Sequence, residues 1–342
     1  MQPRELEARY AAALGTEIRA HEWQWTPQTL YLGGGTPSAM EPAVFQETLR
    51  DLPGRPWTEA TVEAAPGSLT PERVAAWMEA GINRASLGVQ SFVKAELART
   101  GRKHDAAIVR HDVELLRANG IHNINLDLIA GLPGQTADSW KASLEGVLSL
   151  DAPHVSVYML EVDDESRLGS EIILGGKRYG ASDVPGDDQI AAFYEYAVEE
   201  LARHGIPRYE ISNFARPGAE SLHNLKYWHR EPYIGFGSDA HSFDGISRWQ
   251  NVEAAKDYVA LSEKGAPVRE EITRPDPVEE KFFVGLRLSE GVEPDPSDWL
   301  RYGPALERFL AGGVMERHGK RLRLTARGVM ISNEIFQEFL AA

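Results

Sequence analysis

Residues that suit a small polar ligand follow several apolar runs in the first part of the chain. Three glycines at 33–35 come directly after the run TLYL, and without side chains they leave backbone N–H and C=O groups open to contact. Glu63, Gln90 and Asp127 stand at the ends of the next runs. Carboxylates accept hydrogen bonds from ribose hydroxyls, and bare glycine backbone can bind an amine or a carboxylate. The expected ligand is a small molecule with a sugar and a zwitterionic or anionic end.

Each of these features also has a plainer interpretation when it is taken alone. A glycine run is typical of a tight strand-to-helix turn, and a buried carboxylate commonly caps a helix or pairs with an arginine. The recurrence of such residues at four successive strand ends favours one common site.

The elements that must carry these residues alternate between strand and helix. Strands are predicted at 29–32, 60–64, 85–89, 122–129, 153–160 and 207–212, helices at 4–21, 41–51, 70–81, 93–100, 105–118, 136–149 and 187–204, and an acidic loop at 163–186. Connections of helix length require parallel strands. A full or partial (β/α) barrel and a doubly wound sheet both fit this order. The barrel is favoured because it collects every strand end around one mouth.

Beyond residue 213 the alternation stops. Residues 214–252 are predicted to be loop-like, with His223, His229 and His241 among aromatic residues and glycines. A lone histidine more often packs or faces solvent than binds a ligand, but an aromatic surface with an exposed imidazole would suit a flat, apolar, metal-bearing ligand. The sequence therefore leaves both interpretations open for these histidines.

The C-terminal part is predicted to be a small winged-helix-like domain. Helices at 277–288, 299–311 and 328–340 enclose a β-ribbon at 320–325. The predicted organisation is a partial barrel at 1–213, an aromatic and His-containing connecting region at 214–274, and this domain at 275–342. It lacks a dense basic recognition helix, so packing or a lid is favoured over DNA binding.

Composition narrows the classes of protein further. The net charge of −15 argues against a nucleic-acid partner held by phosphate neutralisation. No apolar run is long enough to span a membrane, and a cytoplasmic protein is expected. The 342 residues include no cysteine, which excludes disulfides, thiolate zinc sites and Cys-ligated iron–sulfur clusters within this sequence.

Several motifs carry a resemblance to a known family. They are LGGGTPS (32–38), VEAAPGSL (62–69), INRASLGVQSF (82–92), NINLDLIAGLPGQT (123–136), YEISNFARPG (209–218), HNLKYW (223–228) and GLRLSEGV (285–292). With them the chain resembles the oxygen-independent coproporphyrinogen III oxidase-like group of radical S-adenosylmethionine (SAM) proteins. Within that group it is most similar to the HemW-type haem chaperones. The resemblance runs from about residue 5 to the C-terminus and implies a TIM-like radical SAM barrel.

The resemblance also implies roles for individual residues. The positions that match the family's SAM contacts are Gly33, Gly34, Gly35, Thr36, Glu63, Gln90, Arg102 and Asp127. The positions that match the HNxxYW motif of the haem chaperones are His223, Asn224, Tyr227 and Trp228. His223 is then the expected axial ligand of haem iron, because a neutral imidazole nitrogen is a good iron donor. The alternative is that His223 and Asn224 only brace a loop.

The family's cluster motif has no counterpart in this sequence. The CxxxCxxC loop follows the first barrel strand in the family, whereas this chain begins at the following helix. Ala130 and Ser221 are smaller departures, because an aromatic residue and a cysteine are usual there. Two explanations are open: the start codon was placed too late, which the intact downstream motifs favour, or the loop has been lost.

Three functions follow from the resemblance as alternatives. The first is a haem chaperone that binds haem and SAM and passes haem to haem-dependent respiratory enzymes. The second is a radical SAM oxidoreductase of porphyrin biosynthesis, active only if a cluster-bearing N-terminus is restored. The third is a folded remnant that binds neither ligand. Radical chemistry is not expected from the chain as given, because reductive cleavage of SAM needs the [4Fe–4S] cluster.

Overall fold

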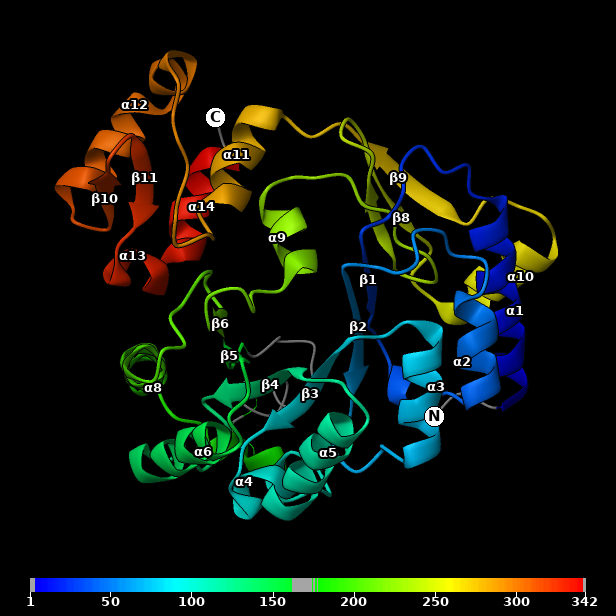
Figure 1. Cartoon of the computed structure of the whole chain (residues 1–342). Helices are drawn as coiled ribbons and strands as arrows, with labels where there is room; N and C mark the ends of the chain where they lie inside the picture. Colours follow the sequence, from blue (N-terminus) through cyan, green and yellow to red (C-terminus); the bar gives the residue numbers. More distant parts are fainter. Residues whose placement is uncertain (1–3, 162–173, 175, 177, 341–342) are drawn as a thin grey trace.

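Five apolar strands in the first half of the chain pair in the order in which they occur in the sequence. They are β1 (Thr29–Leu32), β2 (Glu59–Ala64), β3 (Arg84–Gln90), β4 (Asn123–Ala130) and β5 (His154–Met159). Each pairs in parallel with the next. In this computed structural model, which describes residues 4–161, 174, 176 and 178–340, the strands form a curved sheet (Figure 1). The predicted α/β class with a partial parallel barrel is confirmed.

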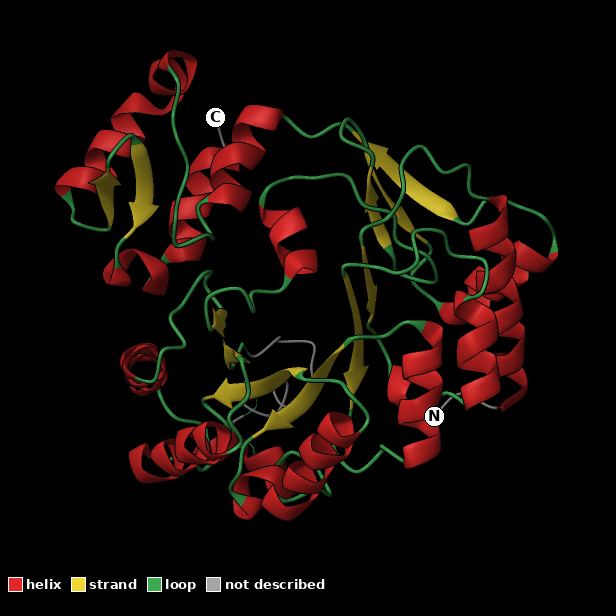
Figure 2. Cartoon of the chain, viewed as in Figure 1, coloured by secondary structure: helices red, strands yellow, loops and turns green. Residues whose placement is uncertain are grey.

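The helices that connect the strands lie on the outer side of the curved sheet (Figures 1 and 2). They are α2 (Pro42–Leu49), α3 (Pro71–Ala80), α4 (Lys94–Arg99), α5 (Ala106–Ala118), α6 (Ala137–Ser149) and α8 (Asp187–Arg203), and α1 (Arg4–Ala20) precedes β1. Local chemistry sets their ends. At α3 the Thr70 hydroxyl accepts the backbone N–H of Arg73, and Gly81 ends the helix at a φ of 95°, which glycine adopts without strain.

Alternate residues of each strand face the helices and form the hydrophobic core. Val62, Leu87, Leu126 and Val155 are fully buried and belong to one cluster that includes Trp77 of α3. Burial of this face against the helices supplies most of the driving force for the fold. The intervening residues of the same strands point to the inner side of the sheet.

The predicted strand at 207–212 is wrong. The sixth strand is β6 (Asn213–Ala215), which pairs antiparallel with β5. The preceding residues turn back instead of extending, so that Arg208 bridges Phe214 and Glu210 bridges Leu288. Residues of this segment do form β-bridges, but their partners lie on two different segments, so no continuous strand results.

The prediction that residues 214–252 are loop-like is wrong. Residues 214–274 contain α9 (Leu222–Trp228), α10 (Ala255–Glu263) and an antiparallel sheet of β7 (His241–Phe243), β8 (Arg248–Asn251) and β9 (Arg269–Thr273). These strands have three to five residues, so their alternation is too short to stand out in the sequence. The region packs on the N-terminal helix, where the rings of Tyr10 and Tyr258 lie 5.2 Å apart.

The C-terminal region is a small domain of helices and a two-stranded ribbon, as predicted. It contains α11 (Pro277–Gly285), α12 (Pro296–Ala311), β10 (Met315–His318), β11 (Arg321–Leu324), α13 (Ala326–Met330) and α14 (Ser332–Leu340). Phe282 stacks on Phe339 with ring centroids 4.7 Å apart. Glu280 joins the domain to the preceding region, because its carboxylate accepts a hydrogen bond from Arg248 Nε at 2.6 Å and lies 3.6 Å from Arg230 Nε.

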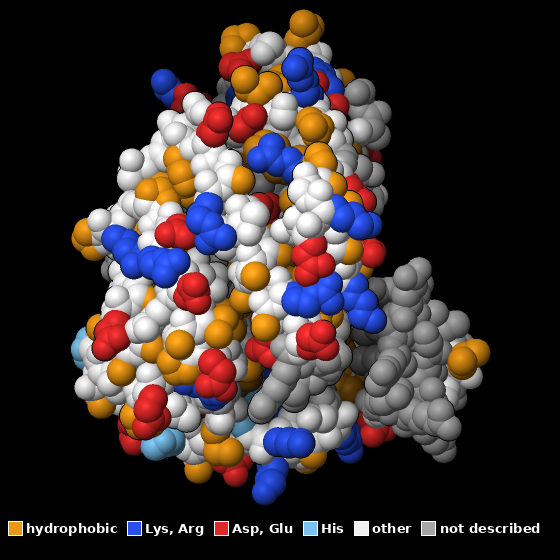
Figure 3. All heavy atoms as spheres, turned by 90° about the vertical axis from the view of Figure 1, so that its right-hand side faces the viewer, with side chains coloured by type: hydrophobic (Ala, Val, Ile, Leu, Met, Phe, Trp, Pro, Cys, Tyr) orange, Lys and Arg blue, Asp and Glu red, His pale blue; other side chains and the backbone are white. Residues whose placement is uncertain are grey.

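Among the described residues, two short 3₁₀ helices lie in the connections between larger elements. η1 (Pro37–Ala39) follows β1, and η2 (Arg178–Asp183) lies in the predicted acidic loop at 163–186, most of which falls outside the described residues. On the described part of the face in Figure 3, Lys and Arg side chains are interspersed with Asp and Glu. Every described helix is too short or too polar to span a bilayer.

Candidate functional site

The inner face of the curved sheet is lined by polar side chains. They are Thr29 and Tyr31 of β1, Glu59, Thr61 and Glu63 of β2, Arg84 and Ser86 of β3, Asn125 and Asp127 of β4, and His154 and Ser156 of β5. Buried polar groups are stable only when they are hydrogen-bonded, and this network supplies the partners. Asn125 is central, since its side-chain nitrogen lies within 2.9 Å of Ser86, Ser156 and Asp127.

The glycine turn after β1 leaves open backbone at the carboxyl end of the sheet. Residues 33–36, which we call the glycine cradle, are exposed. Gly34 and Gly35 have φ angles of 76° and 58°, and no atom lies within 4 Å of where their Cβ would stand. Glu63 lies beside them, because its carboxylate accepts the N–H of Gly34 at 3.3 Å and the hydroxyl of Tyr31 at 2.8 Å. The cradle therefore offers exposed main-chain groups next to a carboxylate.

Gln90 ends the adjacent strand β3, and Asp127 lies on the strand after it, β4. Asp127 accepts hydrogen bonds from Asn125 at 2.7 Å and Ser86 at 3.1 Å. Burial raises the pKa of the Asp127 carboxyl, and the nearby charge of Glu63 adds to that rise. Gln90 lies at a β-bulge with a φ of 66° and accepts a hydrogen bond from Arg102 Nε at 3.0 Å. The structure thus brings Glu63 and Asp127 within range of each other's charge, and it pairs Arg102 with Gln90 at the carboxyl end of β3.

Helix α9 docks on the inner side of the sheet through Glu59. This carboxylate is buried at 2% exposure and accepts the backbone N–H groups of Leu222 at 3.0 Å and His223 at 2.9 Å, and the hydroxyl of Ser221 at 3.3 Å. A negative charge at a helix N-terminus satisfies otherwise unpaired donors. Arg84 Nε lies 3.9 Å from the same carboxylate. Glu59 therefore holds the start of α9 in place.

The imidazole of His223 is engaged at both nitrogens. Nδ1 lies 2.9 Å from the Thr29 hydroxyl, and Nε2 lies 2.7 Å from the hydroxyl of Tyr227. The ring stacks on Tyr31 with centroids 5.3 Å apart. Burial lowers the pKa of His223 to about 4, and the charges of Lys226 and Arg84 add to this effect. His223 is thus a neutral imidazole that links α9 to β1.

Acid is expected to destabilise the chain partly through His223. Its pKa of about 4 lies below the ordinary value of 6.5, so the unfolded chain binds this proton more readily than the folded chain. Stability from the neutral imidazole is therefore present above pH 6.5 and is lost as the pH falls toward 4. The urea midpoint of the native chain should fall more over this interval than that of a His223→Gln variant. Equal pH dependence in the two chains would contradict the assignment.

Similarity to known proteins identifies the family of this chain. The radical SAM superfamily model matches residues 2–146, and the HemN C-terminal domain model matches residues 272–331. The heme chaperone HemW of Bacillus subtilis is 36% identical over 92% of this chain and 85% of that protein. The heme chaperone HemW of Lactococcus lactis is 34% identical over 92% of this chain and 84% of that protein. The chain belongs to the HemW family.

The fold of this HemW family member also occurs in a solved structure. Coproporphyrinogen III oxidase (HemN) from Escherichia coli, a radical SAM enzyme, superimposes with a TM-score of 0.82, covering 99% of this chain and 85% of that chain. At 21% sequence identity this likeness establishes the fold alone. In the present chain no cysteine is available, so its residues do not fit a thiolate-bound [4Fe–4S] cluster.

The other residues of the HNxxYW motif have distinct surroundings in this HemW family member. Tyr227 packs edge-on against Tyr233 at 4.5 Å. The Trp228 ring lies 4.6 Å from the Arg287 guanidinium, and its indole N–H has no hydrogen-bond acceptor among the described residues. Asn224 donates its backbone N–H to the Ser221 hydroxyl at 3.4 Å. The motif therefore spans from β1 to the C-terminal domain.

Several residues of the site were missed by sequence reasoning. Tyr31, Glu59, Arg84, Asn125 and Ser156 all belong to the inner network. The signal was present, because polar residues alternate with apolar ones along each strand, as in EATVEA and NINLDLIA. The polar members of this alternation form the second face of the sheet, which is a polar interior.

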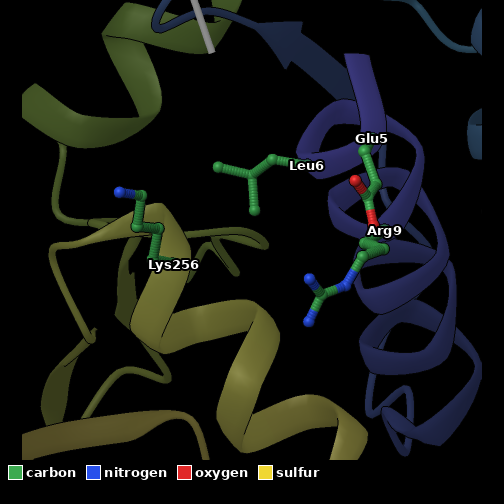
Figure 4. A pocket seen from close by; sticks show the side chains of 4 residues that line it. All are labelled: Glu5, Leu6, Arg9 and Lys256. Carbon is green, nitrogen blue, oxygen red and sulfur yellow. The ribbon is translucent and has the colours of Figure 1, made fainter. Parts of the chain in front are cut away.

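A separate surface groove lies away from this site. It has a volume of about 350 Å³ and is lined by Glu5, Leu6 and Arg9 of α1 and Lys256 of α10 (Figure 4). The Arg9 guanidinium is already bound by the Glu263 carboxylate through two hydrogen bonds of 2.7 Å. The groove therefore marks the packing of α1 on α10 and is not part of the polar interior.

Proposed function

We propose that this chain is a haem-binding protein of the chaperone type that also binds SAM. The observation that carries the proposal is the position of α9, which bears the HNLKYW motif and docks through His223 onto the strand that leads into the glycine cradle. The relatives named heme chaperone HemW support it. We further propose a cytoplasmic location and haem-dependent respiratory enzymes as recipients of the haem.

SAM fits the cradle by the chemistry of the groups present. Open backbone at 33–36 suits the amine and carboxylate of its methionine end, and Glu63 and Asp127 suit its amine and ribose hydroxyls. Arg102, linked to Gln90, supplies a cation for the carboxylate. The function of these residues in the proposal is to bind and orient SAM. The proposal includes no catalysis, because the chain offers no thiolate for the cluster.

We propose that haem binds at α9 and the residues around it. In the family pattern His223 supplies the axial nitrogen, and this assignment stays a prediction. Iron binding at Nε2 of His223 requires the loss of its 2.7 Å contact with Tyr227, while binding at Nδ1 requires the loss of the contact with Thr29. Haem iron takes neutral imidazole, and the lowered pKa keeps His223 in that form.

Titration of the full chain with ferric protoporphyrin IX tests the haem part of the proposal. We expect saturable binding at one site with a shifted Soret band. A spectrum identical to that of free haem in the same buffer would overturn haem binding. His223→Ala tests the family assignment separately, because unchanged spectra would rule out His223 as the iron donor.

Calorimetric titration with SAM tests the cradle. Glu63→Ala is expected to weaken SAM binding about tenfold, since a carboxylate that accepts a charged amine contributes roughly 1.5–3 kcal/mol. Glu47→Ala is the matched control, because its side chain is 71% exposed on α2 and pairs with Arg50 at the surface. Equal affinity of the native and Glu63→Ala chains would place SAM elsewhere.

A further inference from the structure

Helix α9 carries one histidine near its start and is followed by another, and the two lie on different faces. His223 and Tyr227 face β1 and are engaged there. Leu222, Leu225, Lys226 and His229 follow the helical spacing of the opposite face. These four line an open groove of about 220 Å³ together with Gln28, Thr29, Thr58 and Glu231. The exposed face of α9 is therefore one wall of a groove at the start of β1 and β2.

His229 presents a free nitrogen in this groove. It follows the last residue of α9, its side chain is 44% exposed, and its backbone N–H is fixed by the carbonyl of Leu225 at 2.8 Å. Nδ1 lies 4.0 Å from Glu290 Oε1, whereas Nε2 has no partner among the described residues. At 4.0 Å the Glu290 carboxylate does not form a hydrogen bond with Nδ1, so the Nε2 lone pair of the neutral ring can be offered to a metal.

The groove has the mixed chemistry that suits a flat ligand with carboxylates. Leu222 is 40% exposed, which leaves apolar surface beside the imidazole. Lys226 stands at the same wall, where its amine contacts Gln28 Oε1 at 3.1 Å and Glu231 Oε2 at 2.5 Å. A ligand carboxylate can replace Glu231 as the partner of this amine. Apolar surface, one free imidazole and one cation match an iron porphyrin with carboxylate side chains.

We propose that His229 is the iron donor for haem on this chain and that His223 positions α9. The inference rests on the proposed haem binding and deepens it by moving the iron from the engaged imidazole to the free one. His223 keeps its contacts with Thr29 and Tyr227 in this arrangement, so the helix stays docked while haem lies in the groove. The ligand class is an iron porphyrin dicarboxylate.

Ferric protoporphyrin IX titration of four full-length chains tests the assignment. They are the native chain, His229→Ala, His223→Gln and the control His204→Ala, whose imidazole is 49% exposed at the end of α8. Removal of the axial donor should weaken binding about tenfold or more and return the Soret band of the bound ferric haem toward that of haem without a histidine ligand. His204→Ala should behave like the native chain. Metal-free protoporphyrin should bind the native and His229→Ala chains equally, because it needs no iron donor.

The outcomes separate this inference from the proposed function. If His229→Ala keeps the native affinity and Soret band while His223→Gln loses them, the inference is overturned and haem binding stands. If the native chain binds no haem, the proposed function fails first. Lys226→Ala adds an independent arm: it should weaken iron protoporphyrin IX several-fold but not its dimethyl ester, and equal losses for both would contradict the carboxylate contact.

Discussion

Replacing Glu59 with alanine is expected to destabilise the chain by about 3–5 kcal/mol and to release the start of α9. The carboxylate is buried and accepts two backbone N–H groups of α9 and the Ser221 hydroxyl. Its loss leaves these donors without an acceptor. It also leaves the buried guanidinium of Arg84 without its anionic neighbour at 3.9 Å. Both consequences are costly in a buried region.

Urea denaturation followed by circular dichroism measures this effect. Glu47→Ala is a matched control, because its side chain is 71% exposed and its contact with Arg50 is 3.8 Å, for which we expect a change within about 0.5 kcal/mol. Glu59→Gln keeps the size and one acceptor, so it should lie between the two. A loss below about 1 kcal/mol for Glu59→Ala would show that α9 is held by other contacts.

The release of α9 in Glu59→Ala can be measured separately, through the pKa of His223. The lowered pKa of this imidazole depends first on burial between β1 and α9. In Glu59→Ala the pKa measured by NMR should rise from about 4 toward the ordinary 6.5. An unchanged pKa together with lost stability would place the damage in the sheet rather than at the helix.

The substitution Gly33→Val is expected to disturb the glycine cradle and α9 together. A Cβ on Gly33 would lie 2.8 Å from Tyr31 Cε1 and 3.1 Å from Glu63 Oε1. The Tyr31 ring must then move, and overpacking of this kind costs about 1–3 kcal/mol. Tyr31 donates its hydroxyl to Glu63 and stacks on His223, so its displacement reaches both groups. We expect SAM affinity to fall about tenfold or more.

Two measurements on the Gly33→Val chain, compared with one control variant, detect this displacement of the Tyr31 ring. Calorimetry reports SAM affinity, and NMR titration should show the pKa of His223 rising above about 4 as the ring that covers it moves. Gly88→Ala is the control on β3, because a Cβ there meets only the Ala64 carbonyl oxygen at 4.0 Å. It should leave the pKa of His223 unchanged. A Gly33→Val chain with native SAM affinity would contradict the cradle assignment.

The contacts of Tyr31 connect the two proposed ligand sites. Glu63 contacts the backbone of Gly34 and the hydroxyl of Tyr31, and the Tyr31 ring stacks on His223. The chain of contacts is short because β1 carries the cradle at one end and Thr29, which contacts His223, at the other. Variants at either end are therefore best measured with both ligands.

The sequence by itself determined the five parallel strands, the helices that connect them and the strand-end residues of the site. Strand and helix signals are local properties, so TLYL could be placed as a run of β-forming residues and NINLDLIA from its alternation. Parallel order then follows from connections of helix length. Because parallel strands share one carboxyl edge, the strand-end position of Glu63 predicts that it lies near the glycines, and its carboxylate accepts the N–H of Gly34.

Only the tertiary structure decided which partners each polar group has. Glu59 and the N–H of His223 are 164 positions apart, and no local pattern pairs them. No local pattern pairs His223 with β1 either, where the Thr29 hydroxyl contacts its Nδ1 and the Tyr31 ring stacks on its face. A hydrogen bond depends on distances of about 3 Å and on direction, and these are set by packing between distant segments. The sequence could therefore name His223 and His229 as candidates. Only the fold shows that both ring nitrogens of His223 are engaged, whereas Nε2 of His229 has no partner among the described residues.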